Sequence, residues 1–168
     1  MRLDGDAMLD LAQLRRLVAY NQWADEKILN VSDGLTQEDL DRKVDAYVGT
    51  LGEALRHNLG AQRLWLARWK GEPNPSLDAP PAGHWRAAFA EVHAGQRAFV
   101  EALSAANAGR TTRWTDLAGH SHEGELDQLI VHTVNHGTHH RAELGLLLER
   151  IGRSPGDMDY LYYHLANR

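Results

Sequence analysis

The 168-residue chain contains no cysteine, and this absence excludes several kinds of chemistry. Disulfide bonds, thiolate metal sites, iron–sulfur clusters and a cysteine nucleophile all require a thiol. The chain also lacks any run of about 18 apolar residues, so we expect no membrane span. Residues 1–10 contain Asp4, Asp6 and Asp10, where a signal peptide would have a basic start and an apolar core. We therefore expect the protein in the cytoplasm.

The chain also lacks a large net charge of either sign. The 18 basic and 23 acidic side chains give a net charge of -5, and the basic residues are scattered along the chain. Nucleic-acid-binding surfaces need concentrated positive charge, so we expect a small-molecule substrate and no nucleic-acid or membrane partner. The length and the 43% hydrophobic content are typical of one globular domain, here residues 1–168.

Glycine and proline residues divide the chain into intervals long enough for helices. Apolar residues at three- and four-residue steps predict four long helices, at 9–31, 50–71, 82–106 and 125–151. Asp25 lies off the apolar stripe of the first of them. Thr50 and Glu53 form a T-x-x-E capping box, which places the start of the second. Shorter helices are expected at 36–41 and 157–165.

Two segments between the long helices lack the helical period. Residues 71–83 contain four prolines, so we expect an ordered surface crossing there. Residues 110–124 place threonines and Trp114 beside a polar turn, a pattern that predicts a small β-hairpin. The resulting fold class is all-α, a four-helix bundle with a hairpin-like excursion before its fourth helix. The long crossing leaves open whether successive helices alternate in direction.

With no cysteine, histidine is the side chain left for borderline metal chemistry, and the chain has ten. Four of them lie on the fourth predicted helix, at His132, His136, His139 and His140. At about 100° per residue, His136 and His140 point toward the bundle interior or its edge, whereas the other two lean outward. Two histidines at i and i+4 can bind one metal ion. The alternative is a pair of buried histidines hydrogen-bonded to the facing helices.

His57 lies within the second predicted helix, and small residues surround it. Its neighbours one turn away are Ala54, Gly60 and Ala61, which leave space that a bundle core normally fills with leucine or isoleucine. Such space suits a ligand pocket between facing helices. The alternative is close helix packing around the small residues, with His57 reaching solvent.

Glu143 follows His139 and His140 by about one turn, so its carboxylate could orient a histidine ligand or move a proton from bound water. A surface charge is the alternative. His93 is expected to be half-buried. The other histidines outside the cluster are expected to be exposed: His84, His120, His122 and His164. Three tryptophans are assigned to packing: Trp23, Trp65 and Trp69.

Three stretches stand in an order typical of one protein family: YNQWADEKIL at 20–29, TLGEALRHNLGAQRLWLAR at 50–68 and HTVNHGTHHRAEL at 132–144. Together they resemble the DinB (DNA-damage-inducible) family of the DinB/YfiT-like superfamily, over about residues 10–165. The resemblance implies a four-helix bundle, usually a homodimer, with a divalent metal held by one histidine of the second helix and two of the fourth. The corresponding ligands are His57, His136 and His140. Where family sequences commonly have glutamine, this chain has Glu143.

Three imidazole ligands leave an open coordination position, which is typical of catalytic sites. Zinc or nickel suits imidazole, and iron or manganese remain alternatives. Superfamily relatives include thiol-dependent transferases, so the resemblance implies a low-molecular-weight-thiol S-transferase acting in stress or detoxification. The thiol would be external, such as bacillithiol, mycothiol or glutathione, because the chain has none. The alternatives are a metal-dependent hydrolase and a noncatalytic metal-binding stress protein.

Overall fold

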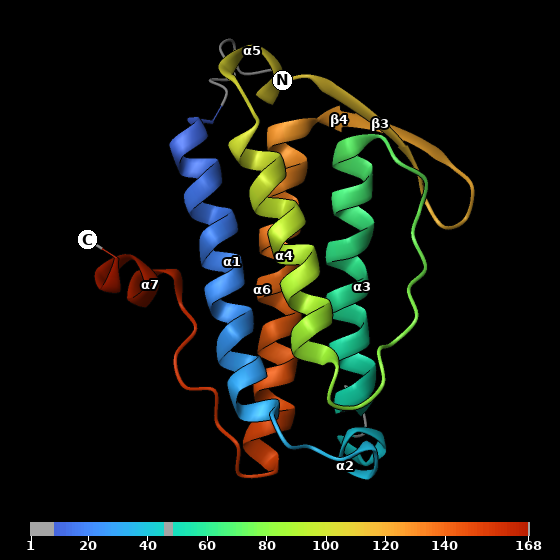
Figure 1. Cartoon of the computed structure of the whole chain (residues 1–168), viewed down its shortest axis with the longest axis vertical. Helices are drawn as coiled ribbons and strands as arrows, with labels where there is room; N and C mark the ends of the chain where they lie inside the picture. Colours follow the sequence, from blue (N-terminus) through green and yellow to red (C-terminus); the bar gives the residue numbers. More distant parts are fainter. Residues whose placement is uncertain (1–8, 46–48, 168) are drawn as a thin grey trace.

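The computed structural model of the chain describes residues 9–45 and 49–167, so Asp4 and Asp6 lie outside the described residues. Four long helices lie side by side, as the sequence predicts (Figure 1). They are α1 (Leu11–Ser32), α3 (Leu51–Lys70), α4 (Trp85–Glu101) and α6 (Leu126–Arg150). The described part of the chain adds three short helices, α2 (Gln37–Asp41), α5 (Ala105–Ala108) and α7 (Tyr160–Ala166).

Two small antiparallel pairs of strands accompany the helices, so the all-α class predicted from the sequence is too narrow. The predicted hairpin is present as β3 (Thr111–Thr115) and β4 (Ser121–Glu125), in which Trp114 lies opposite His122. The sequence did not predict β1 (Lys43–Asp45) and β2 (Gly49–Thr50), which lead into α3. Strands of two or three residues are too short for an alternating pattern to be recognised.

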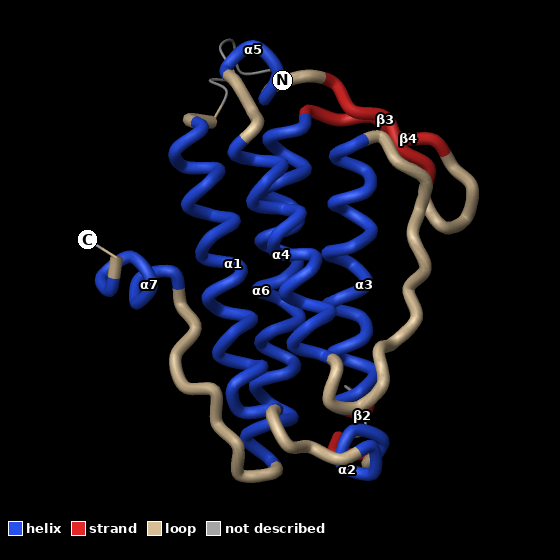
Figure 2. The backbone as a smooth tube through the Cα atoms, in the orientation of Figure 1, coloured by secondary structure: helices blue, strands red, loops and turns tan. Residues whose placement is uncertain are grey.

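Successive long helices do not simply alternate in direction. Helix α6 packs against α1 and α3, and α4 packs against the same two helices. Figure 1 shows that α3 and α4 run parallel to each other, opposite to α1 and α6. The proline-rich segment after α3 makes this possible, because it runs back along the length of α3 before α4 begins (Figure 2). The predicted surface crossing therefore fixes the topology.

The start of α3 follows the capping box predicted from the sequence. The Glu53 backbone N–H donates to Thr50 Oγ1 at 3.1 Å, and the Thr50 N–H donates to Glu53 Oε2 at 2.9 Å. The third long helix is shorter than predicted, because α4 ends at Glu101 and residues up to 106 do not continue it. Ser104 adopts an extended backbone there and caps the separate helix α5 through Asn107.

The apolar stripes predicted for the long helices meet in one buried core. Its fully buried members come from all four helices: Leu14 and Ile28 of α1, Leu55, Leu59 and Trp69 of α3, Phe89 of α4, and Ile130, Leu144 and Leu148 of α6. Burying each such side chain contributes roughly 1.5–3 kcal/mol before the loss of conformational entropy is counted.

A polar network crosses this core and joins all four long helices. Its centre is Asp25 of α1, which is 1% exposed, although the sequence pattern placed it off the apolar stripe. The Asp25 carboxylate has four partners from the other three helices: Asn58 Nδ2 at 3.1 Å, Gln62 Nε2 at 2.8 Å, His93 Nε2 at 2.9 Å and Arg141 Nη1 at 3.1 Å. His93 is thus fully buried rather than half-buried.

Arg141 is the only guanidinium in this network, and it too is almost completely buried. It donates to Asn21 Oδ1 at 2.6 Å and to Thr138 Oγ1 at 3.1 Å, besides the carboxylate. Burial would raise the pKa of Asp25, but the nearby Arg141 and His93 outweigh it and hold the pKa below its ordinary value. The folded chain therefore keeps Asp25 ionised, with each oxygen hydrogen-bonded.

Gly137 allows α6 to approach this network closely. A Cβ atom at this position would lie 2.6 Å from Asn21 Oδ1 and 2.8 Å from Arg141 Nη1. Both atoms are held by hydrogen bonds inside the core, so neither side chain can move away without breaking one.

We expect Gly137→Ala to destabilise the protein by about 1–3 kcal/mol, because the steric cost exceeds the helix-propensity gain of about 1 kcal/mol. Gly145→Ala, on the same helix, is the matched control. Its Cβ would meet only Met158 and Pro155 at 3.4 Å and 3.8 Å, so this substitution should be neutral or stabilising. Urea unfolding of both variants measures the difference, and equal free energies of unfolding would contradict the close approach.

Asp25→Asn should lower the free energy of unfolding by about 3–5 kcal/mol near neutral pH, because it leaves Arg141 buried without its counter-charge. The folded-state pKa of Asp25 is lowered, so its contribution is present above the ordinary value of 3.8 and is lost as the pH falls through the lowered pKa. The difference between wild type and variant should therefore shrink in acid.

Urea unfolding between about pH 7 and pH 3 tests this dependence. Asp41→Asn is the control, because Asp41 is exposed on α2 and its substitution should change stability by less than about 0.5 kcal/mol throughout. A wild-type-to-Asp25→Asn difference that stays constant down to pH 3 would show that the carboxylate is not preferentially ionised in the folded chain.

Candidate metal centre

Helices α3 and α6 bring three of the predicted histidines together. His57 lies on α3, and His136 and His140 lie one turn apart on α6. Nε2 of His57 lies 3.0 Å from Nε2 of His140, and one nitrogen of each of the three rings lies within 4.8 Å of the others. The ring centroids of His136 and His140 are 4.3 Å apart. A group of this composition could hold a metal ion.

The spacing of the nitrogens fits a shared metal. Two imidazole nitrogens bound to a tetrahedral zinc at about 2.0–2.1 Å lie about 3.3 Å apart, close to the 3.0 Å between His57 and His140. None of the three side chains is buried: His57 is exposed, and His136 and His140 are half-buried. An ion bound by them would therefore stay accessible to a small molecule.

Glu143 orients one of the three rings. Its Oε2 lies 2.6 Å from Nδ1 of His140, so a proton on Nδ1 leaves the Nε2 lone pair facing His57. A carboxylate behind a histidine ligand fixes the ring and raises its basicity. The structure thus places Glu143 where the sequence analysis expects a supporting carboxylate.

The electrostatic surroundings favour uncharged rings. Burial, together with the neighbouring His140, lowers the pKa of His57, although Glu143 opposes this effect. Burial and the adjacent histidines lower the pKa of His136 to about 4. At neutral pH these imidazoles are therefore uncharged, and each keeps one nitrogen lone pair of the kind that metal ligation requires.

The two other histidines of α6 lie beside the cluster. His139 is exposed, and its Nε2 lies 3.4 Å from Glu143 Oε1. With His140 and Glu143 it forms a second group that could hold a metal. We favour the first group because its ligands come from two helices and Glu143 is already bonded to His140. His132 is exposed, as predicted, and its ring also stacks on His136 at 5.7 Å and contacts Trp65 at 4.7 Å.

The buried network holds the backbone on both sides of the cluster. Asn58 follows His57 directly, and Arg141 follows His140 directly, and both donate to Asp25. The apolar pattern of the sequence did not predict this support. Polar residues that recur one turn apart on the buried faces could have indicated it: Asn21 and Asp25 on α1, and Asn58 and Gln62 on α3.

The remaining histidines do not join the cluster. His120 and His122 are exposed on the hairpin and contact Asp116, at 3.3 Å and 2.9 Å. The hydrogen bond from His122, with others from the turn backbone, lowers the pKa of Asp116 to about 2. His84 is exposed as predicted, whereas His164 is half-buried and stacks on Tyr160.

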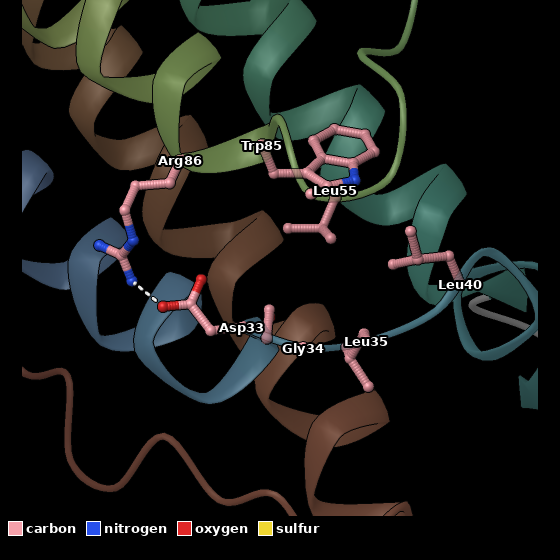
Figure 3. A pocket seen from close by; sticks show the side chains of 9 residues that line it. Asp33, Gly34, Leu35, Leu40, Leu55, Trp85 and Arg86 are labelled. Carbon is pink, nitrogen blue, oxygen red and sulfur yellow. Dashed lines mark hydrogen bonds and ion pairs between the residues drawn. The ribbon is translucent and has the colours of Figure 1, made fainter.

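A separate cavity of about 120 Å³ lies where α1 ends and α3 and α4 begin (Figure 3). Its walls include four apolar side chains, Leu35, Leu40, Leu55 and Trp85. Arg86 donates to Asp33 at 2.8 Å, so the charged groups at its edge neutralise each other. The lining offers no unpaired titratable group, and we assign this cavity to packing.

Comparison with known proteins agrees with this geometry. The DinB family matches residues 8–167 of the chain. The chain belongs to the DinB family. One similar DinB-like structure, a protein from Bacillus cereus ATCC 10987, has a TM-score of 0.63 and 18% sequence identity, with 83% of this chain and 91% of that chain covered. This likeness concerns the fold. No curated protein matches the chain.

Family membership accounts for the arrangement of the long helices, whereas the ligand set rests on the geometry of the histidines. None of the described helices is long and apolar enough to cross a membrane.

Proposed function

We propose that this DinB family member is a divalent-metal-dependent enzyme whose ion is held by His57, His136 and His140. The observation that carries the proposal is the 3.0 Å separation of Nε2 atoms from two helices, in residues 83 positions apart in the sequence. Glu143 supports it by orienting His140. Zinc or nickel is favoured by the imidazole ligands, with iron or manganese as alternatives.

We infer further that the enzyme is a low-molecular-weight-thiol S-transferase. When bound, the ion lowers the pKa of a thiol or water at its open position. The chain has no thiol, so the sulfur must come from an external cofactor such as bacillithiol, mycothiol or glutathione. The sulfur would form a bond to an electrophilic carbon of the second substrate as the bond from that carbon to its leaving group breaks, and the leaving group would depart with the electron pair of that bond. Glu143 Oε1, which lies 3.4 Å from Nε2 of the exposed His139, would accept the proton that the thiol loses.

Two other functions use the same residues. A hydrolase would activate water instead of a thiol, and a noncatalytic stress protein would bind metal without turnover. The half-buried, accessible ligands favour a catalytic role over a purely structural one, because structural metal sites are closed by four protein ligands.

We also propose that residues 1–168 form one four-helix-bundle domain and that it acts as a homodimer. The family resemblance supports a dimer, and exposed apolar side chains offer a surface for it: Leu146 on α6, and Tyr160, Leu161, Tyr162 and Leu165 on α7.

Substituting any of the three ligands should reduce metal binding. We expect His57→Ala, His136→Ala and His140→Ala each to weaken the affinity for zinc by at least about 100-fold, because only two nitrogens remain. Metal content per chain, measured on tag-free protein by mass spectrometry, checks this. His139→Ala is the matched control, since it lies on the same helix and should retain the metal. Loss of metal in His139→Ala alone would place the ion on the second group instead.

Thiol transfer should depend on both the metal and an added thiol. Metal-loaded protein mixed with a model electrophile should consume bacillithiol, mycothiol or glutathione, and His136→Ala should reduce the rate to the uncatalysed background. Substrate cleavage without any thiol would favour the hydrolase, and metal-dependent thermal stabilisation without turnover of any substrate would favour the noncatalytic protein.

A further inference from the structure

A row of ring side chains leads from the candidate metal centre toward the hairpin. His132 lies 5.7 Å from His136 between ring centroids, and Trp65 lies 4.7 Å from His132. Trp114 of β3 lies 5.6 Å from Trp65 and the same distance from His122 of β4. Aromatic surfaces arranged in this way can hold the apolar or planar part of a ligand.

Arg68 lies at the hairpin end of this row, against the face of the Trp65 ring. Its guanidinium carbon lies 4.7 Å from the centroid of the Trp65 ring, and the residue is only 7% exposed. Its Nε is buried without a hydrogen-bond partner. Among the residues that the structure describes, no carboxylate forms an ion pair with Arg68. Burial lowers the pKa of Arg68, and the charge of Asp116 opposes this effect.

Arg141, the other buried arginine among the residues that the structure describes, does not share this condition. It is bonded to Asp25, Asn21 and Thr138. An arginine is almost never buried without pairing, because desolvating the charge has a large cost. An arginine that only supports the fold would be expected to pair as Arg141 does. The unpaired state of Arg68 therefore indicates that its partner is a ligand.

The direction of the side chain agrees with this interpretation. Side chains on a helix lean toward its N-terminus, and the N-terminal half of α3 contains His57. Arg68 accordingly reaches back over Trp65, toward the metal centre. The Cα atoms of His57 and Arg68 are separated by roughly 16 Å along the helix, at about 1.5 Å per residue. One elongated small molecule can span both.

We propose that Arg68, together with Trp65 and Trp114, binds the carboxylate end of a substrate whose reacting end lies at the histidine cluster. That the other end of the substrate reacts at the histidine cluster rests on the proposed function. The binding of a carboxylate by Arg68 requires no metal. Under the proposed thiol chemistry, it favours a thiol or an electrophile that carries a carboxylate over an uncharged one. The planar guanidinium can donate two parallel hydrogen bonds to such a group.

The test compares two probes of the same shape, 4-phenylbutyrate and its neutral amide, by titration calorimetry on the full chain. Metal-free protein should bind the carboxylate at least about tenfold more tightly than the amide, because a charge-assisted hydrogen bond is lost with the amide. Arg68→Met should remove this difference. Arg63→Met is the matched control, since Arg63 lies on the same helix beside a different cavity with Leu66, Lys70 and Glu91, and should keep it.

Equal affinity of the wild-type protein for the two probes, or no binding of either, would overturn the proposal. So would an equal loss in Arg68→Met and Arg63→Met. The melting temperature gives a separate readout: Arg68→Met should match or exceed wild type, because it removes a buried charge without a partner, and a clear decrease would mean that Arg68 is structural.

Measuring zinc binding alongside the preference for the carboxylate probe distinguishes a failure of this proposal from a failure of the proposed function. If the histidines bind no metal, the preference for the carboxylate probe in metal-free protein still stands. If the protein binds zinc and shows no such preference, the metal centre stands and the carboxylate site is wrong.

Discussion

The buried pair of Asp25 and Arg141 is the constraint on which the rest of this structure depends. A carboxylate and a guanidinium removed from water must each be fully hydrogen-bonded, and here the bonds can form only when α1, α3, α4 and α6 meet in one register. An apolar core of the same volume would tolerate sliding of one helix along another. The network therefore contributes specificity of arrangement more than net stability. Because Asn58 and Arg141 directly follow two of the clustered histidines, the same register sets the geometry of the candidate metal centre.

Much of this architecture could be predicted from the sequence, because it follows from local patterns. Three- and four-residue apolar steps gave the four long helices, a Thr50–Glu53 capping box located the start of α3, and the i, i+4 spacing placed His136 and His140 on one face. The network could not be predicted in the same way. A charged residue such as Asp25 is by default assigned to solvent, and only contacts with helices far away in the sequence reveal that His93 and Arg141 make its burial favourable. The position of His132 against Trp65 depends likewise on the packing of α3 on α6.

Two groups of polar side chains in this protein differ in how their hydrogen-bonding capacity is used. Those around Asp25 satisfy one another and have no capacity left for a ligand. The side chains along the row of rings from the histidine cluster to the hairpin differ, since Arg68 keeps an unbonded nitrogen and the nitrogens of His57 and His140 face one another. Buried polar groups that lack a hydrogen-bond partner within the chain are the places where a folded protein is expected to carry its function. The histidine cluster and Arg68 both adjoin the row of rings that leads to the hairpin.

The distance in sequence between His57 and His140 has a consequence for how the protein is made. The two residues are 83 positions apart, and α6 is the last of the long helices to be synthesised. At about 5–20 residues per second, a ribosome needs roughly 4–17 s to proceed from the first of these histidines to the last. During most of this interval a nascent chain carries only one of the three proposed ligands, too few to hold an ion against other cellular ligands. Under the proposed function, metal binding therefore has to await the synthesis of α6.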